Sequence, residues 1–301
     1  MRQLNSIKNI LILGSGTLGL RIGLRCAMDG YNVKMYDRTD EILEKSRAIQ
    51  QKLLTSSIKK GAFNGDADEV MARITSTTDP KEAVIGVDLV SESVTENLDL
   101  KIGVYKLFAP LFPKHAIITT NTSYLLPSQL VEASEAGERF CALHFHDVFT
   151  MNVVDVMPHP ETAPWLTSLL MDFGKTIHQI PVHVGVENHG YIFNQMLLSL
   201  IGAAGDLLSR KVATIQDIDK SWMGNTKMGM GPFGMLDQIG LETAWHITSS
   251  LSDKKSQRFA AILKEKVDAG KLGIKTGSGF YDYPNPEYLN PEFLGKLKIE
   301  S

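Results

Sequence analysis

The sequence predicts an α/β protein in which a Rossmann-type, doubly wound parallel sheet is followed by an all-α C-terminal domain. Short β-rich runs alternate with helical stretches in the first half of the chain, a pattern typical of a parallel sheet with helices on both faces. The first β-rich run leads directly into glycines spaced as GxGxxG, and from about Tyr191 onward the patterned segments are helical. We therefore expect a dinucleotide-binding domain at residues 1–186 and a helical domain, for substrate binding and dimerisation, at residues 187–301.

Each expected element follows from its own pattern of apolar residues. Short runs rich in β-branched residues predict strands at residues 9–13, 32–37, 88–94, 116–121, 140–145 and 176–185. Helical periodicity predicts helices at residues 22–30, 41–54 and 100–112, and in the second half at residues 191–211, 214–222, 234–251 and 255–271. The segment from Tyr191 to Arg210 is apolar on most faces, so we expect it to be buried at a domain or subunit interface.

Composition excludes several classes of partner. The 301 residues are 43% hydrophobic and 22% charged with a formal net charge of −3, so neither a nucleic acid nor a membrane is an expected partner. No apolar run approaches the roughly 20 residues that span a bilayer, and the N-terminal residues do not form a signal peptide. Cys26 and Cys141 lie in apolar contexts, which indicates buried thiols in a reducing cytoplasm.

The glycine pattern predicts a dinucleotide site. Gly14 permits a tight turn, Gly16 lets the backbone approach a pyrophosphate, and Gly19 lets the helix pack closely on the strand. The N-terminus of the following helix offers N–H groups to the phosphates. The residues expected to contact the cofactor here are Gly14, Ser15, Gly16, Thr17, Leu18 and Gly19.

The end of the second strand indicates which dinucleotide binds. Asp37 follows Gly19 by 18 residues, where a carboxylate can bind the hydroxyls of the adenosine ribose and would repel a 2′-phosphate. The adjacent Arg38 could instead accommodate that phosphate, although a solvated surface arginine is the simpler interpretation. We expect NAD rather than NADP, with Asp37 and Arg38 both near the ribose.

Several stretches together resemble the 3-hydroxyacyl-CoA dehydrogenase family, and within it the branch that contains diketoreductase and λ-crystallin (gulonate dehydrogenase). The resemblance runs from about residue 7 to residue 283. It rests on ILGSGTLGLRIG, DLVSESVTENLDLK, AIITTNTSYLLPSQL, FCALHFHDVFTMNVVDVM, NHGYIFNQMLLS, MGPFGMLDQIGL and the ending DAGKLGIKTGSGFYDY.

The resemblance implies an activity and a set of site residues. The expected reaction is NAD-dependent interconversion of a 3-oxo acyl group or ester and its L-3-hydroxy form, as in fatty acid metabolism. The family's catalytic histidine maps to His144, its glutamate to Asp155, its serine to Ser123 and its asparagine to Asn194. Further cofactor contacts are implied at Glu96, Lys101 and Asn121.

The stretch HFHD at residues 144–147 also raises the question of a metal. The HxHxDH signature of binuclear zinc hydrolases fails here, because Asp147 follows His146 directly and Val148 comes next. Two histidines two positions apart on a strand do point to the same side, so a metal is geometrically possible, but hydride transfer to nicotinamide needs none. It needs a proton donor near the carbonyl oxygen, which suits a histidine held by an anion. We expect no metal, His144 as general acid and base, and His146 as a pocket wall or surface group.

Two departures from the family leave alternatives open. Asp155 is one methylene shorter than glutamate, and its separation from His144 is one residue shorter than usual. Asp147 is therefore a rival for the anion that orients His144. The substrate is either a short 3-hydroxyacyl-CoA or a diketoreductase-type compound without CoA, and the alternative function is a non-catalytic, crystallin-like NAD-binding protein. The apolar helices of the second half predict a homodimer.

Overall fold

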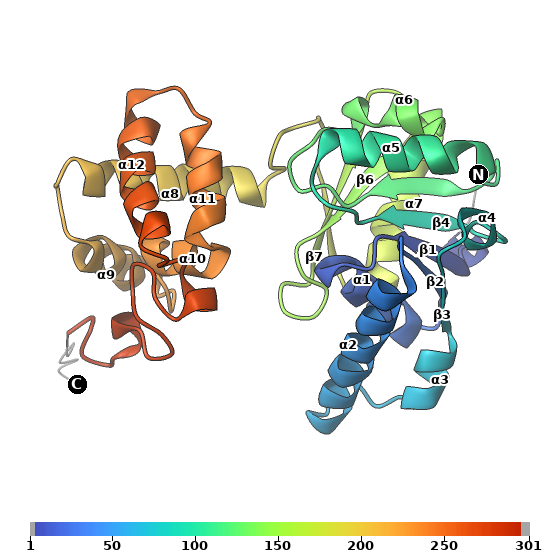
Figure 1. The fold of residues 1–301 in the computed structure, drawn as a ribbon, viewed down its shortest axis with the longest axis horizontal. Coiled ribbons are helices and arrows are strands. Elements are labelled where there is room, and N and C mark those ends of the chain that lie inside the picture. Colours follow the sequence, from blue (N-terminus) through green and yellow to red (C-terminus); the bar gives the residue numbers. More distant parts are fainter. Residues whose placement is uncertain (1–3, 296–301) are drawn as a thin grey trace. The chain divides into compact units, whose positions relative to one another are not determined.

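The computed structural model describes residues 4–295, and the chain divides into two compact units, Met1–Ile192 and Phe193–Ser301 (Figure 1). The first unit extends past residue 186 because Tyr191 is buried within it. The Tyr191 hydroxyl donates a hydrogen bond of 2.8 Å to the carbonyl oxygen of Thr122, and its ring stacks on His144. Among the described residues, no helix has the length and apolar character needed to cross a bilayer.

The first unit is built on one eight-stranded sheet. The strands are β1 (Asn9–Leu13), β2 (Asn32–Tyr36), β3 (Ile74–Thr77), β4 (Leu89–Glu92), β5 (Ile117–Thr120), β6 (Phe140–Phe145), β7 (Val153–Pro158) and β8 (Ile180–His183). Their order in the sheet is β3-β2-β1-β4-β5-β6-β7-β8. The first six strands are parallel and follow the strand order of a Rossmann fold, as the sequence predicts.

The last two strands run in the direction opposite to that of the six parallel strands. β6 and β7 are antiparallel, and β7 and β8 are parallel to each other. The connection between Phe145 and Val153 is too short for a crossover helix, so the chain turns back as a hairpin. This hairpin places His144 directly opposite Asp155.

Helices cover both faces of the sheet. They are α1 (Thr17–Met28), α2 (Asp40–Lys59), α3 (Ala67–Ala72), α4 (Pro80–Ala83), α5 (Leu98–Phe108), α6 (Val131–Ser134) and α7 (Pro164–Thr176). Alternate residues of β1 enter different cores: Ile10 and Ile12 pack with α1, α2 and α7, whereas Leu11 and Leu13 pack with α5. Because successive side chains of a strand point to opposite faces, a strand buried on both sides reads as the continuous apolar run NILIL.

The second unit is helical around its own core. Its helices are α8 (Phe193–Ser209), α9 (Ile215–Thr226), α10 (Pro232–Ile239), α11 (Leu241–Ser249) and α12 (Lys254–Asp268). The single helix expected at residues 234–251 is two helices, because Gly240 adopts a φ of 99° and ends α10. In α8 only Ile201, Ala204 and Gly205 are buried within the described chain.

The GKLGIKTGSGF segment closes the second unit over a buried carboxylate. Asp237 accepts hydrogen bonds from the backbone N–H groups of Phe280 and Tyr281 and from the Tyr283 hydroxyl. A Cβ at Gly279 would lie 2.0 Å from Asp237 Oδ1, so a side chain there would collide with this carboxylate. A Cβ at Gly273 would likewise lie 2.2 Å from the Asp237 carbonyl oxygen, so the close approach of the loop to Asp237 explains these two glycines of the motif.

Candidate active site

The expected site residues of the first unit gather at one edge of the sheet. Parallel strands end at the same edge, and ligands of open α/β sheets bind outside their carboxyl ends. Gly14 follows β1, Asp37 follows β2, Glu96 comes after β4, Ser123 comes after β5, and His144 lies near the end of β6. Residues 130 positions apart in sequence are thus brought to one edge of the first unit.

The glycine turn fits a dinucleotide. Gly14 has a φ of 97°, and a Cβ there would lie 2.8 Å from the Ser93 carbonyl oxygen. A Cβ at Gly19 would lie 2.0 Å from the carbonyl oxygen of Gly14, whereas a Cβ at Gly16 would meet open space. Among the described residues no side chain caps α1 at Gly16. The turn therefore leaves room for a phosphate at an uncapped helix N-terminus.

Asp37 lies against this turn. Its Oδ2 accepts a 2.7 Å hydrogen bond from the backbone N–H of Ser15, and its Oδ1 accepts one from the N–H of Arg38. The carboxylate is thus fixed beside the glycine turn, and its contact with the ribose stays a prediction. The Ser15 side chain is buried and faces the Tyr36 carbonyl, so its backbone is the part that borders the site, while Thr17 and Arg38 are exposed. Leu18 is half-buried.

His144 and Asp155 form a buried pair across the β6–β7 hairpin. His144 Nδ1 lies 3.1 Å from Asp155 Oδ2, and the two residues face each other in the strand register. Both side chains are buried, with exposed fractions of 4% and 2%. The shorter separation in sequence does not prevent the contact, because the antiparallel register sets the partner of His144.

The contacts of His146 and Asp147 differ from those considered in the sequence analysis. His146 Nε2 lies 2.8 Å from the same Oδ2 of Asp155, so it belongs to the cluster and is not a surface group. Asp147 is not the anion beside His144: its two oxygens accept hydrogen bonds of 3.0 and 2.9 Å from Arg21. Residues at i and i+2 of a strand share a face, which brings His144 and His146 to one carboxylate.

Burial and hydrogen bonding shift the pKa values of His144 and Asp155 in opposite directions. Burial lowers the pKa of His144 below its ordinary value of 6.5, and Asp155 opposes this effect by stabilising the imidazolium. Burial alone would raise the pKa of Asp155, but hydrogen bonds from His144 and His146 hold it below its ordinary 3.8. At neutral pH the pair therefore consists of a carboxylate and an imidazole that is able to exchange a proton.

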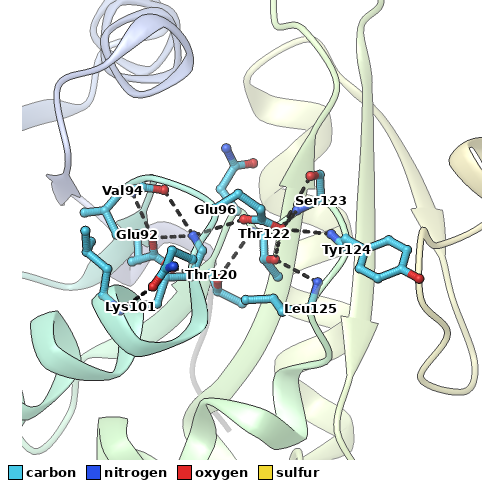
Figure 2. A network of polar contacts seen from close by, with 12 residues as sticks. Glu92, Val94, Glu96, Lys101, Thr120, Thr122, Ser123, Tyr124 and Leu125 are labelled. Atoms are coloured by element: carbon cyan, nitrogen blue, oxygen red, sulfur yellow. Dashed lines mark hydrogen bonds and ion pairs between the residues drawn. The ribbon is translucent and has the colours of Figure 1, made fainter. Parts of the chain in front are cut away.

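A second polar network fixes the turn after β5 (Figure 2). Glu96 Oε1 accepts hydrogen bonds from the backbone N–H groups of Ser123 (2.9 Å) and Tyr124 (3.0 Å), and the Thr122 hydroxyl donates to the same oxygen. The Ser123 hydroxyl lies 3.4 Å from Glu96. Burial alone would raise the pKa of Glu96, but the Thr122 hydroxyl and the Lys101 ammonium lower it. Glu96 therefore holds the Ser123 turn as a carboxylate.

Lys101 supports this network from within the protein. Its side chain is 1% exposed, and its ammonium binds Glu92 at 2.7 Å, the Val94 carbonyl at 3.2 Å and Glu96 at 3.4 Å (Figure 2). A direct contact of Lys101 with the cofactor stays a prediction. In the structure the residue is covered and supports the Ser123 turn through Glu96.

Two neighbouring residues hold His144 and its strand. Asn121 Oδ1 accepts a 2.8 Å hydrogen bond from the backbone N–H of Phe145, which ties the end of β5 to β6. The Tyr191 ring stacks on the His144 imidazole at 4.6 Å between centroids, with Tyr191 at a φ of 55°. Sequence reasoning missed this role of Tyr191, and its place before the first long helix gave no signal of it. Asn194 lies in the first turn of α8, in the other compact unit, so its role at the site stays a prediction.

Comparisons with known proteins match both parts of the chain. Residues 9–187 match the NAD binding domain of 3-hydroxyacyl-CoA dehydrogenase, and residues 190–283 match its C-terminal domain. The human mitochondrial hydroxyacyl-coenzyme A dehydrogenase is 32% identical over 288 residues, which cover 92% of this chain and 91% of the human protein. The 3-hydroxybutyryl-CoA dehydrogenase of Clostridioides difficile is 29% identical, covering 91% of this chain and 99% of that protein.

Solved structures give the same result. One solved structure concerns the substrate-directed dual catalysis of dicarbonyl compounds by diketoreductase. It superposes with a TM-score of 0.87 and 38% sequence identity, and the match covers 94% of this chain and 100% of that chain. The (S)-3-hydroxybutyryl-CoA dehydrogenase PaaH1 from Ralstonia eutropha has a TM-score of 0.84 and 30% identity, covering 93% of this chain and all of the other.

The fold and the matched domains define the class: this is an NAD-dependent oxidoreductase that acts on a CH–OH group, with a Rossmann-type domain followed by a helical domain. More specifically, the chain belongs to the 3-hydroxyacyl-CoA dehydrogenase family. This confirms the resemblance, the fold class, the cofactor NAD and the enzyme class predicted from the sequence.

Proposed function

We propose that the protein interconverts a 3-oxo acyl group or ester and its L-3-hydroxy form, with His144 as the general acid and base. The observation that carries this proposal is the buried His144–Asp155 pair, 3.1 Å apart at the sheet edge that also holds the glycine turn. A histidine suits the reaction because its pKa lies near neutrality, so it can both give and take back a proton.

Each site residue has a separate task in this proposal. Bound NADH supplies the hydride. Asp155 occupies Nδ1 of His144, so Nε2 is the nitrogen that exchanges a proton with the substrate oxygen. Glu96 holds the turn that carries Ser123, whose hydroxyl binds the substrate oxygen. For Asn194 of the helical domain we keep the role that the family resemblance implies.

Oxidation of NADH by the purified protein tests the proposal. We expect a loss of absorbance at the reduced-nicotinamide band with acetoacetyl-CoA or with ethyl acetoacetate, and much slower turnover by His144→Ala. NADH binding without turnover of either substrate would instead support the crystallin-like, non-catalytic alternative. The arrangement of Ser123, His144 and Asp155 argues against that alternative, because a protein that only binds NAD needs no acid–base pair.

A substrate without CoA is the second candidate, and the similarity to diketoreductase favours it.

The oligomeric state and the cellular location of the enzyme are also proposals. We infer a homodimer through the helical domain, because Phe193 and Met196 of α8 are 45% and 60% exposed. Light scattering that reports a monomer at micromolar concentration would contradict it. We place the protein in the cytoplasm and in fatty acid metabolism, with the free and buried Cys26 and Cys141 supporting a reducing compartment.

A further inference from the structure

The contact of His146 with Asp155 is not used by the proposed reaction. One carboxylate is enough to orient His144, yet Asp155 Oδ2 faces an imidazole nitrogen of each histidine, at 3.1 and 2.8 Å. One nitrogen from each imidazole and one carboxylate oxygen lie within 4.8 Å of one another. We propose that His144, His146 and Asp155 form a binding site for a divalent transition-metal ion of the zinc type, and that the bound ion switches the enzyme off.

The spacing of the three ligand atoms fits such an ion. Zinc binds histidine nitrogen and carboxylate oxygen at about 2.0–2.2 Å, so neighbouring ligand atoms of a tetrahedral site lie roughly 3.3–3.5 Å apart. The observed separations of 3.1 and 2.8 Å need to widen by a few tenths of an ångström when an ion replaces the hydrogen-bond protons, and the two nitrogens, which lie within 4.8 Å of each other, need to adjust to the same ion. Rotation of the His146 side chain supplies this adjustment without movement of the strands.

The elements that carry the ligands make the site rigid. His144 and His146 point from the same face of β6, and Asp155 projects from the paired position of β7. The three side chains are buried or nearly so, with exposed fractions of 4%, 8% and 2%. The Tyr191 ring packs on His144 and restricts its rotation. A site built on paired strands is held closer to its binding geometry than one built on loops.

The ligand set selects the class of ion. Two imidazoles and one carboxylate suit zinc and cobalt, whereas magnesium and calcium prefer sites made of oxygen atoms alone. Three protein ligands leave a fourth position open, as in catalytic zinc sites. The HxHxDH pattern fails in this sequence because Val148 stands at the position of its aspartate, but the fold supplies Asp155 from the next strand instead.

The predicted effect on turnover rests on the proposed function, whereas the binding itself does not. An ion held by His144 and Asp155 occupies both members of the acid–base pair, so the substrate oxygen loses its proton donor. Inhibition should therefore be reversed by a chelator, because no bond of the protein is broken.

Calorimetric titration of the full-length protein with Zn²⁺ tests the site directly. We expect one ion bound per chain, at least tenfold weaker binding by His146→Phe and by His146→Asn, and unchanged binding by His183→Gln. His183 is the matched control because it is an exposed histidine on β8, outside the cluster. Two substitutions are used at residue 146 so that one still decides the result if the other fails to fold, which thermal melting will report.

Spectroscopy and kinetics then separate the two parts of the inference. Co²⁺ should give the intense visible absorption of a tetrahedral site in the wild type and lose it in His146→Phe. Zn²⁺ should inhibit NADH oxidation by the wild type at least tenfold more strongly than by His146→Phe. Equal Zn²⁺ affinities for the wild type and both variants at residue 146 would overturn the site. His146-dependent binding in a protein that turns over no 3-oxo substrate would sink the proposed function and leave the site standing.

Discussion

Each compact unit buries carboxylates, but the groups around them differ in kind. In the first unit, Asp155 faces the imidazoles of His144 and His146, which can carry a proton. In the second unit, Asp237 accepts from two backbone N–H groups and the Tyr283 hydroxyl, and Asp219 accepts from backbone N–H groups and the Tyr281 hydroxyl. The first set of partners consists of imidazoles, whose nitrogens can exchange a proton, whereas the second set consists of neutral donors.

The difference appears in the direction of the pKa shifts. Burial raises the pKa of Asp219 and of Asp237, and their neutral donors compensate only in part. Burial acts in the same direction on Asp155, but the two histidines outweigh it and lower its pKa. A buried carboxylate with neutral donors ties elements of the fold together, whereas one with titratable partners has the means to assist proton transfer.

Among the substitutions that test this comparison, removal of the proton donor should have the largest effect, and the quantity affected is kcat. His144→Ala should lower kcat about 10²–10⁴-fold, the usual range for general acid–base catalysis, whereas NADH affinity should not change because the glycine turn and Asp37 are intact. Asp155→Asn should also cost heavily, since a neutral amide no longer stabilises the imidazolium. Stopped-flow kinetics with NADH and ethyl acetoacetate measure both.

A matched substitution in the second unit shows whether burial alone explains such a loss. Asp219→Asn removes the charge of a carboxylate that is equally buried. Its kcat should stay within a few-fold of the wild type. A loss as large as that of Asp155→Asn would remove the distinction between the two carboxylates.

Removal of Asp237 should instead reduce stability. Asp237→Ala leaves two backbone N–H groups and the Tyr283 hydroxyl without their acceptor, at a cost of about 1–3 kcal/mol for each stranded group. We expect the free energy of unfolding of the helical unit to fall by about 3 kcal/mol, measured by urea denaturation. Asp237→Asn, which keeps one acceptor oxygen, should lose less; equal losses would show that hydrogen bonding is not the cause.

A fall in pH should change the contributions of the two clusters to folding stability in opposite directions. The folded-state pKa values of His144 and Asp155 lie below their ordinary 6.5 and 3.8, so their stabilisation is present above those values and is lost as pH falls through the folded-state values. The folded-state pKa of Asp237 lies above 3.8, so its contribution is fully present below 3.8 and is lost as pH rises through the folded-state value.

Melting temperatures between pH 3 and pH 8 measure this difference. The gap between the wild type and His144→Ala should shrink as pH falls from 7 to 3. The gap between the wild type and Asp237→Asn should widen over the same range. Parallel changes in both gaps would show that the two clusters do not differ in the sign of their pKa shifts.

The fold was predictable wherever one segment carries its own signal. The run NILIL followed by the glycine turn gave β1 and α1, but β3, β7 and α7 were missed because their short or mixed patterns become regular only when packed on the sheet. The site was predictable in part. Spacing alone left Asp147 and Asp155 as rivals, and only the β6–β7 register shows which one faces His144. The contact of His146 with Asp155 also depends on that register.

The smallest predicted effect concerns Asp37, a carboxylate that is only partly buried. NADH should be preferred over NADPH by at least about tenfold in kcat/KM, or roughly 1.4 kcal/mol, because Asp37 repels a 2′-phosphate. Asp37→Ser should abolish this preference, whereas Arg38→Gln should leave it or increase it. Equal use of both cofactors by the wild type would mean that the Arg38 guanidinium overrides Asp37. The effect is small compared with that of His144 because solvent screens a half-exposed carboxylate. Asp37, the fourth carboxylate after Asp155, Asp219 and Asp237, extends the comparison from buried carboxylates to one near the protein surface.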